Sequence, residues 1–542
     1  MSKSDGTDLT LPGFAPGTGP GTEVAGLASP AKGQSGLTVA SFIAENIRAA
    51  GKEPARVLGG FFAAWILFFL LLKVIPAPNG LSANGMACLA VVVWASIMWV
   101  SEALPVGITG ISIPTLLILT HTIPWDKGKP PMAQVFAGFT DHVVWLCLFA
   151  FFIAAIMQLL KLDRRIALAI LDRIRASTVG QVIWGMFGVN IVLAFLVPAA
   201  NARAATLLPV VKGIVDLLGD TPEEKEAKKA IVIQSLVYGA MICGVFIMTA
   251  HLPNMIMIGI FENNGFKNLG YLDWMILQFP YLGMFVITQW WVRYHFKTKA
   301  IKIAGGHESI HKMHKDLGPM TAPEWMLLAL FVGIAVIFAM GKGSPIYHLH
   351  SLQLGIIGLV GMMILFTPGL FPFTWKAVQE RTIWGTFLLL GGAITMTSAM
   401  AKSGLAAWLA DIIHGSVIGL PWWGIVLALM AGTHVIRIGM LSNVAAVAML
   451  APVVFAMAPK VGLNAVPFTL LVCDTDTYAY LLPTQITAAV IAYGSDTFST
   501  GDYAKAGWVC ILIAMAYGLI VMAPWYAFLG LPVWNPSAPW PF

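Results

Sequence analysis

Apolar residues are gathered into runs of nearly twenty residues that recur from Val57 to Phe528, with only short polar gaps between them. A run of this length forms a helix that crosses about 30 Å of hydrocarbon. The pattern predicts an all-α polytopic membrane protein with about 11 transmembrane helices. The predicted spans cover residues 57–75, 86–101, 106–121, 143–160, a span interrupted at Pro253, 274–291, 325–340, 353–366, a span beginning at Ile383, a span interrupted near Pro483, and 506–528.

Two further apolar runs are broken by short polar sequences at matching positions in the two halves of the chain. The first break lies within 197–211 and the second within 441–454, and each is followed by alanine-rich residues and then by Pro-Val-Val. Such paired interruptions mark the binding site of secondary transporters, because the freed backbone groups must face a cavity rather than lipid. We predict two re-entrant hairpins, near 180–218 and 420–459, within an inverted repeat.

The polar segments divide the chain into five parts. Residues 1–50 are expected to form a disordered cytoplasmic tail, because 1–36 are rich in Gly, Pro, Ser and Thr, with a surface helix over 37–50. Residues 51–296 hold the leading span and the first repeat, 297–324 form a cytoplasmic loop, 325–530 hold the second repeat, and 531–542 form a C-terminal tail.

The orientation follows from counting spans. With the N-terminus inside and each hairpin entering and leaving on one face, the basic residues of the loop 297–324 lie in the cytoplasm, as the positive-inside rule requires. These residues are Lys297, Lys299, Lys302, Lys312 and Lys315. The hairpins then open toward opposite faces, and the C-terminus lies in the periplasm. We therefore expect a multi-pass protein of the inner membrane.

Composition agrees with this interpretation. Hydrophobic residues make up 58% of the chain and charged residues 11%, far from the values of a soluble domain. The net charge of +6 lies mostly in loops, so the expected partners are membrane lipids and a small anionic substrate, without nucleic acid. The five cysteines are isolated in apolar segments and suggest neither a disulfide nor a metal site.

The hairpin tips supply the first candidate substrate-binding residues. Asn201 and Arg203 lie at the first tip, and Ser442 and Asn443 at the second. A guanidinium matches a planar oxyanion, so Arg203 is a candidate clamp for a carboxylate or sulfate. The alternatives are a structural role for Arg203 and a second tip whose polar residues only reverse the chain.

Two further breaks supply the remaining candidates. His251, Pro253 and Asn254 interrupt a span of the first half, and Thr484 and Thr487 flank the corresponding break in the second half. A proline in a span frees a carbonyl that an ion or water can use, and His251 could hydrogen-bond an anion. The alternative for His251 is a hydrogen bond to a neighbouring helix.

Asp474 and Asp476 are unexpected in an apolar segment. Acids within a membrane are costly and often belong to ion or proton pathways, so both are candidates for cation coupling. Pairing with Arg437 or Arg203, or a position in a loop before the span, is the alternative.

A literal zinc motif, His307-Glu308-x-x-His311, lies in the loop 297–324. On a helix this spacing places two imidazoles on one face, with the glutamate as general base of a metalloprotease. The motif follows two glycines in a lysine-rich loop, so a membrane zinc metalloprotease and adventitious metal binding are the weaker alternatives, and no metal site is predicted.

At its two breaks the chain resembles the divalent anion/sodium symporter family, which includes bacterial dicarboxylate and citrate carriers and plastid 2-oxoglutarate/malate translocators. The family carries Ser-Asn-Thr at both tips; the second tip here is Ser442-Asn443-Val444 and the first is Ala199-Ala200-Asn201. The resemblance implies the ion transporter superfamily fold, a homodimer, and sodium as a candidate coupling ion at Ala200, Asn201 and Asn443.

One departure bears on coupling. Where the family usually has Thr-Pro-Pro-Asn, this chain has Ile486-Thr487-Ala488-Ala489, so a fixed cation such as Arg203 could replace a mobile one.

The expected function is secondary transport, with no enzymatic activity and no cofactor beyond a coupling ion. The resemblance implies a small divalent organic anion, such as a C4-dicarboxylate, 2-oxoglutarate or citrate, carried by antiport or by sodium or proton symport. Sulfate or another inorganic oxyanion, or a neutral species such as arsenite, is the alternative substrate.

Overall fold

A computed structural model describes residues 39–49, 52–125, 128–197, 199–266, 269–298, 301–340, 354–440 and 442–542. These residues form helices, and no β-strand occurs within these ranges. The chain divides into two compact units, residues 1–57 and 58–542. The first unit contains α1 (Val39–Ala49), which agrees with the predicted surface helix, while the predicted disordered segment 1–36 lies outside the described residues.

The second unit consists largely of apolar helices. Among the described residues, 10 helical segments are long and apolar enough to cross a membrane. They are α2 with η1 (Pro54–Val74), α3 (Ala83–Ser101), α7 (His142–Leu160), α9 (Val179–Leu196), α11, η2 and α12 (Pro222–Phe246), α14, η4 and α15 (Tyr271–His295), α21 (Trp384–Lys402), α23 (Trp422–Gly439), α24 with η6 (Asn443–Val461), and α27, η9 and α28 (Thr500–Phe528).

Further helices belong to the unit. Among them are α4 (Val106–Leu119), α5 (Met132–Val135), α6 (Ala137–Thr140), α8 (Leu162–Arg173), α16 (Gly306–Lys315), α17 (Ala322–Met340), α19 (Leu354–Leu365), α20 (Trp375–Arg381) and α22 (Leu405–Val417). Polar residues cap the N-termini of several spans: Asp141 caps α7, and Thr178 forms a capping box with Gln181 at the start of α9.

Both predicted hairpins are present as pairs of helices. The first consists of α9 and α10 (Ala200–Val215), and the second of α23 and α24 (Asn443–Met457). The second arm of each contains a proline at the same distance from its first residue, Pro209 in α10 and Pro452 in α24. The two segments therefore repeat in structure as well as in sequence, although Pro198 and Leu441 at the breaks lie outside the described residues.

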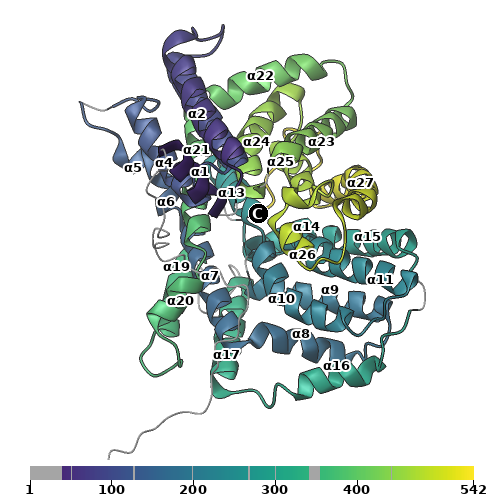
Figure 1. The fold of residues 1–542 in the computed structure, drawn as a ribbon. Coiled ribbons are helices and arrows are strands. Elements are labelled where there is room, and N and C mark those ends of the chain that lie inside the picture. The colour runs from purple at the N-terminus through teal and green to yellow at the C-terminus, as the bar shows by residue number, and fades with distance from the viewer. Residues whose placement is uncertain are drawn as a thin grey trace, which may run out of the picture. The chain divides into compact units, whose positions relative to one another are not determined.

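The two other predicted breaks are also present. In the first half the chain passes from α12 (Gly239–Phe246) through η3 (Met248–Ala250) into α13 (Leu252–Asn263). In the second half it passes from α25 (Ala465–Asp474) through η7 (Thr475–Tyr478) and η8 (Pro483–Gln485) into α26 (Thr487–Tyr493). Helix α10 packs against α26, and α13 packs against α24, so each hairpin contacts the broken segment of the other half (Figure 1).

Helices α4 and α21 approach each other through glycines. A Cβ atom placed on Gly110 would lie 2.6 Å from the carbonyl oxygen of Leu388, and one on Gly392 would clash with the carbonyl oxygen of Gly110. Small residues allow this kind of backbone contact between membrane helices. The contact holds together the two helices that carry one wall of the candidate site.

The segment predicted as the loop 297–324 has more structure than expected. It contains α16, whose Ile310 is buried, and its backbone pairs with the start of the first hairpin. The amide of Ile303 donates to the carbonyl of Ser177 (3.0 Å), and the amide of Val179 donates to the carbonyl of Ile301 (3.1 Å). The helix was not predicted because the segment is highly polar and α16 has a single buried apolar residue.

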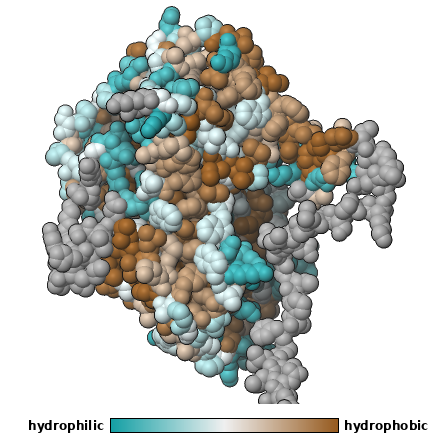
Figure 2. Space-filling model, turned by 90° about the vertical axis from the view of Figure 1, so that its left-hand side faces the viewer, coloured by the Kyte–Doolittle hydropathy of each residue, from teal (hydrophilic) through white to brown (hydrophobic). Residues whose placement is uncertain are grey.

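Large apolar side chains are exposed on the spans, among them Phe62, Met363 and Ile520. The face shown in Figure 2 carries broad hydrophobic areas. Continuous apolar surface of this kind is rare on soluble monomers and suits contact with hydrocarbon. The surface thus agrees with the hydropathy pattern from which the spans were predicted.

Candidate functional site

Four helices of the hairpins and broken segments begin at one cavity of about 290 Å³. This volume is close to the lower end of the roughly 300–1,000 Å³ that small-molecule sites span. Two of the helices are the second arms of the hairpins, and the other two follow the broken segments. The lining residues from these starts are Ala199 and Ala200 of α10, His251 and Leu252 of α13, Ser442 and Asn443 of α24, and Ile486 and Thr487 of α26.

Three of these four helix starts have no side-chain cap. Ala199, His251 and Ile486 occupy the N-cap positions of α10, α13 and α26 without capping through their side chains, whereas Ser442 accepts a hydrogen bond from the amide of Ala445. The first amides of a helix have no partner within the helix, and its N-terminus carries a partial positive charge. Four such ends lining one cavity form a site suited to an anion.

Polar side chains join the two halves at the cavity. Asn201 from the first tip lines it, as do Asn443 from the second tip and His251 from the break between α12 and α13. The Nδ2 atom of Asn443 lies 3.4 Å from Nε2 of His251, so a tip of one half contacts a break of the other. The sequence predicted these residues individually, and the structure brings them together.

The other wall comes from α3, α4 and α21 and the turn between the first two. It was not predicted as part of the site, because its residues have no shared chemical pattern in the sequence. The lining residues on this side are Trp99, Glu102, Val106, Thr386 and Leu389.

Arg203 lies outside the cavity lining, contrary to its expected role as a clamp. Its side chain is fully buried and donates hydrogen bonds to the carbonyls of Val197 (2.7 Å), Ala240 (2.6 Å) and Ala250 (3.0 Å). Val197 ends α9 and Ala250 precedes the break at His251, so the guanidinium ties the first tip to the first broken segment. Two of these carbonyls, those of Val197 and Ala250, lie where the helices are interrupted, and the third, that of Ala240, lies within α12.

Arg437 plays the matching part in the second half. It donates to the carbonyl of Met440 (2.7 Å), which ends α23, to the carbonyl of Gln485, which precedes the break at Ile486, and to Oδ1 of Asn443 (3.0 Å). Arg203 and Arg437 therefore make equivalent tip-to-break contacts, although they occupy different arms of their hairpins. This equivalence is not visible in the sequence.

The two candidate acids lie outside the cavity lining as well. Asp476 forms a fully buried ion pair with Arg437, with 2.7 Å between Oδ1 and Nε. Asp474 accepts a hydrogen bond from Nε2 of Gln278 (2.8 Å), and Gln278 accepts one from the hydroxyl of Tyr526 (3.0 Å). Asp476 therefore pairs with Arg437, which was the alternative to a role in cation coupling. Cation coupling through Asp474 or Asp476 stays a prediction.

Of the remaining predicted substrate-binding residues, some line the cavity and others lie outside it. Pro253 and Thr487 line the cavity, whereas Thr484 and Asn254 do not. The side-chain amide of Asn254 donates to the carbonyls of Gly244 (3.1 Å) and Ile247 (3.2 Å), where α12 ends. Asn254 therefore satisfies backbone groups freed by the break.

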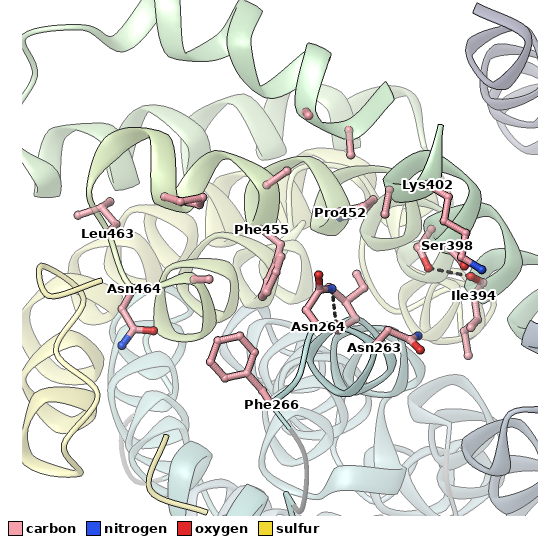
Figure 3. Close-up of a pocket in the computed structure, with 18 of the residues that line it drawn as sticks. Asn263, Asn264, Phe266, Ile394, Ser398, Lys402, Pro452, Phe455, Leu463 and Asn464 are labelled. Atoms are coloured by element: carbon pink, nitrogen blue, oxygen red, sulfur yellow. Dashed lines mark hydrogen bonds between the residues drawn. The ribbon is translucent and has the colours of Figure 1, made fainter. Parts of the chain in front are cut away.

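A larger cavity of about 950 Å³ lies between the ends of α13, α21 and α24 (Figure 3). Phe266 and Phe455 contribute aromatic rings to it, and Asn264 and Lys402 contribute polar groups. It shares no lining residue with the cavity at the tips, and no predicted substrate-binding residue lines it.

The zinc motif lies on α16, and its two histidines face α8. His307 and His311 both contact the carboxylate of Asp172. Glu308, the base that a metalloprotease would need, is exposed. Sequence reasoning missed Asp172, because it is remote in the chain and belongs to no motif.

A multi-pass helical protein with paired hairpins and an anion-suited cavity between their tips has the architecture of a membrane transporter. A family model described as the sodium:sulfate symporter transmembrane region matches residues 61–532, and this chain belongs to that family. Its members are transporters rather than enzymes, so the metalloprotease alternative lacks support, and the resemblance noted in the sequence is confirmed.

Several named proteins are similar along most of their length. A membrane protein of Cupriavidus necator is 29% identical over 489 residues, which cover 87% of this chain and 93% of that protein. The sodium-dependent dicarboxylate transporter SdcS of Staphylococcus saprophyticus is 25% identical (87% and 92% covered), and the L-tartrate/succinate antiporter of Escherichia coli is 24% identical (86% and 97% covered).

Solved structures confirm the fold. The YdaH transporter of Alcanivorax borkumensis aligns with a TM-score of 0.51 at 13% identity, covering 79% of this chain and 99% of that one. MtrF of Neisseria gonorrhoeae aligns with a TM-score of 0.53 at 13% identity, covering 89% and 96%. At this identity the likeness concerns the fold alone.

Proposed function

We propose that this chain is a secondary transporter of the bacterial inner membrane that exchanges small dicarboxylates. The observation that carries the proposal is the meeting of four helix N-termini at one cavity. An anion in this cavity accepts hydrogen bonds from main-chain amides, and these amides can bind it without the help of a mobile cation. The names of SdcS and of the L-tartrate/succinate antiporter support a dicarboxylate as the class of substrate.

The paired arrangement of the tips favours a substrate with two anionic ends. Asn201 with α10 and Asn443 with α24 present equivalent amide donors from the two halves. A C4-dicarboxylate, 2-oxoglutarate or citrate has a carboxylate for each set of donors. Sulfate has a single anionic centre and is the second candidate, supported by the description of the family model.

The two buried arginines favour antiport over sodium symport. In sodium-coupled relatives the resemblance implies a sodium ion between each tip and the neighbouring broken helix. Here the guanidinium groups of Arg203 and Arg437 already bind the carbonyls on both sides of that position, Val197 with Ala250 and Met440 with Gln485. A fixed positive charge stays in the site after the substrate anion has left. The empty carrier is therefore expected to reorient slowly across the membrane, so that exchange of one anion for another dominates.

Proteoliposomes test the proposal. Uptake of labelled succinate is expected to require internal succinate and to be the same in sodium and potassium buffers. Sodium-dependent uptake into empty vesicles would instead establish symport. Unlabelled sulfate, tartrate, 2-oxoglutarate and citrate added outside then rank the substrates, and inhibition by sulfate alone would favour the inorganic alternative.

Two variants test whether the cavity is the substrate-binding site. Asn201→Ala and Asn443→Ala each remove one amide from the cavity and are expected to lower succinate exchange at least tenfold. Asn84→Ala, on α3 and outside the cavity lining, serves as the matched control and is expected to exchange like the unmodified protein. Unchanged exchange in both tip variants would remove the cavity as the binding site.

A further inference from the structure

Three histidines on one face of α16 contact a single carboxylate on α8. The two helices pack side by side (Figure 1). Nε2 of His307 lies 2.7 Å from Oδ1 of Asp172, Nδ1 of His311 lies 3.0 Å from the same oxygen, and Nδ1 of His314 lies 2.8 Å from Oδ2. The spacing of the three histidines along the helix follows its turn, so all three imidazoles point the same way.

The arrangement has the donor types and the spacing of a metal site. Asp172, His307 and His311 each offer one ligand atom, and these atoms lie within 4.8 Å of one another. Ligand atoms about 2.0–2.2 Å from a tetrahedral zinc ion lie roughly 3.3 Å apart, so small side-chain movements suffice to admit the ion. Imidazole nitrogen suits zinc, copper and nickel, whereas calcium and magnesium prefer oxygen ligands.

We propose that Asp172, His307 and His311 bind a divalent transition-metal ion, with zinc as the best match and one coordination position left for water. His314 is a positioning residue that hydrogen-bonds the second oxygen of Asp172 and orients the carboxylate. Such outer contacts are a regular part of metal sites. The site is independent of the transport cavity and of the exchange mechanism proposed above.

The cluster is open to solvent. All four side chains remain partly exposed, between 16% for Asp172 and 54% for His311, so an ion can enter from solvent.

The position of the site suggests what the ion stabilises. Helix α16 belongs to the segment that connects the two repeats, and this segment pairs with the start of the first hairpin through Ile303 and Ser177. An ion bound between α16 and α8 fastens this connection. Bound metal is thus expected to raise the melting temperature of the protein.

Zinc binding to the full-length protein tests the site. The protein is purified in detergent with a histidine-free tag, treated with EDTA and dialysed, and bound zinc is measured by mass spectrometry during titration near pH 7.5. One ion per chain is expected. His307→Ala, His311→Ala and Asp172→Asn should abolish stoichiometric binding, whereas His314→Ala should keep it with an affinity about 10–100-fold lower.

Two controls separate the site from general effects. His414→Ala removes a histidine of α22 outside the cluster and is expected to bind zinc like the unmodified protein. Cobalt in place of zinc should give the visible absorption of a low-coordinate site, absent from the His307→Ala/His311→Ala double variant. Equal zinc binding by the double variant and the unmodified protein, or no saturable binding near one ion per chain, would overturn the proposal.

Discussion

Arg203 shows how a buried cation can have a different purpose from the one its charge suggests. An arginine in an apolar helix of an anion transporter invites a role in substrate binding, since its fork matches a carboxylate. The structure instead directs its donors at the backbone carbonyls of Val197 at the first tip, Ala240 in α12 and Ala250 before the break at His251. Breaking a helix in a membrane leaves carbonyls without partners, and a guanidinium satisfies several of them at once.

This contact set predicts the effect of removing the side chain. Arg203→Ala removes this donor from the carbonyls of Val197 and Ala250, which lie at helix interruptions, at a cost on the order of 1–3 kcal/mol for each buried group left unsatisfied. The melting temperature in detergent is expected to fall by several degrees, and Arg203→Lys, with fewer donors, should recover only part of it. A variant that melts normally but binds succinate weakly would restore the clamp interpretation.

The main-chain amides of the tip can be tested one at a time. Proline suits the first residue of a helix and lacks an amide hydrogen. Ala199 has extended backbone angles (φ −126°, ψ 128°), as a residue before proline requires, so Ala200→Pro should preserve α10 while removing one donor from the cavity. We expect weaker succinate binding with an intact fold.

Thr500→Pro is the matched control for this change. Thr500 is the first residue of α27, follows a residue with extended backbone angles, and lies outside the cavity lining. Isothermal titration with succinate should show a loss for Ala200→Pro that Thr500→Pro does not share. Equal affinities for both variants would mean that the amide of Ala200 does not contact the substrate.

At the scale of elements, the cavity depends on how the helices of one half pack against those of the other. The contacts of α10 with α26 and of α13 with α24 cross the repeats, so neither half forms the cavity alone. The facing wall depends on a different contact, the close approach of α4 and α21 at Gly110 and Gly392. A site assembled from so many elements is sensitive to small displacements between helices.

The glycine contact gives a test of this sensitivity. Gly110→Ala places a methyl group 2.6 Å from a backbone oxygen of α21, so the helices must separate, at a cost of about 1–3 kcal/mol. A Cβ atom placed on Gly432 of α23 would have no neighbouring atom within 4 Å, and Gly432→Ala should be neutral or slightly stabilising. Thermal melting and succinate exchange should both fall for the first variant only.

The elements themselves were predictable from sequence because hydropathy and helix breaks are local properties. Runs of apolar residues specified the spans, and the polar interruptions at Asn201 and Asn443 identified both tips. Contacts between remote segments were not predictable in this way. The wall formed by α3, α4 and α21, the equivalence of Arg203 and Arg437, and the meeting of Asp172 with His307 all depend on packing across the chain, for which a single sequence carries no signal.

At the scale of the whole protein, transport by alternating access requires that the two hairpins be reached from opposite faces of the membrane. The span count and the basic residues of 297–324 predict this orientation, with the first hairpin open to the cytoplasm. The predicted homodimer belongs to the same scale, and chemical cross-linking in membranes followed by gel electrophoresis should yield a product of twice the chain mass.

Labelling of engineered cysteines from the two sides tests the orientation. Asp220 is exposed after the first hairpin, and Ser416 is exposed before the second, while the five native cysteines are buried. In intact cells a membrane-impermeant maleimide should label Ser416→Cys but not Asp220→Cys, and permeabilised cells should show both. The unmodified chain provides the background. Labelling of both positions from the outside would place the hairpin bases on one face, and a carrier built that way could not present the same cavity to the two compartments in turn.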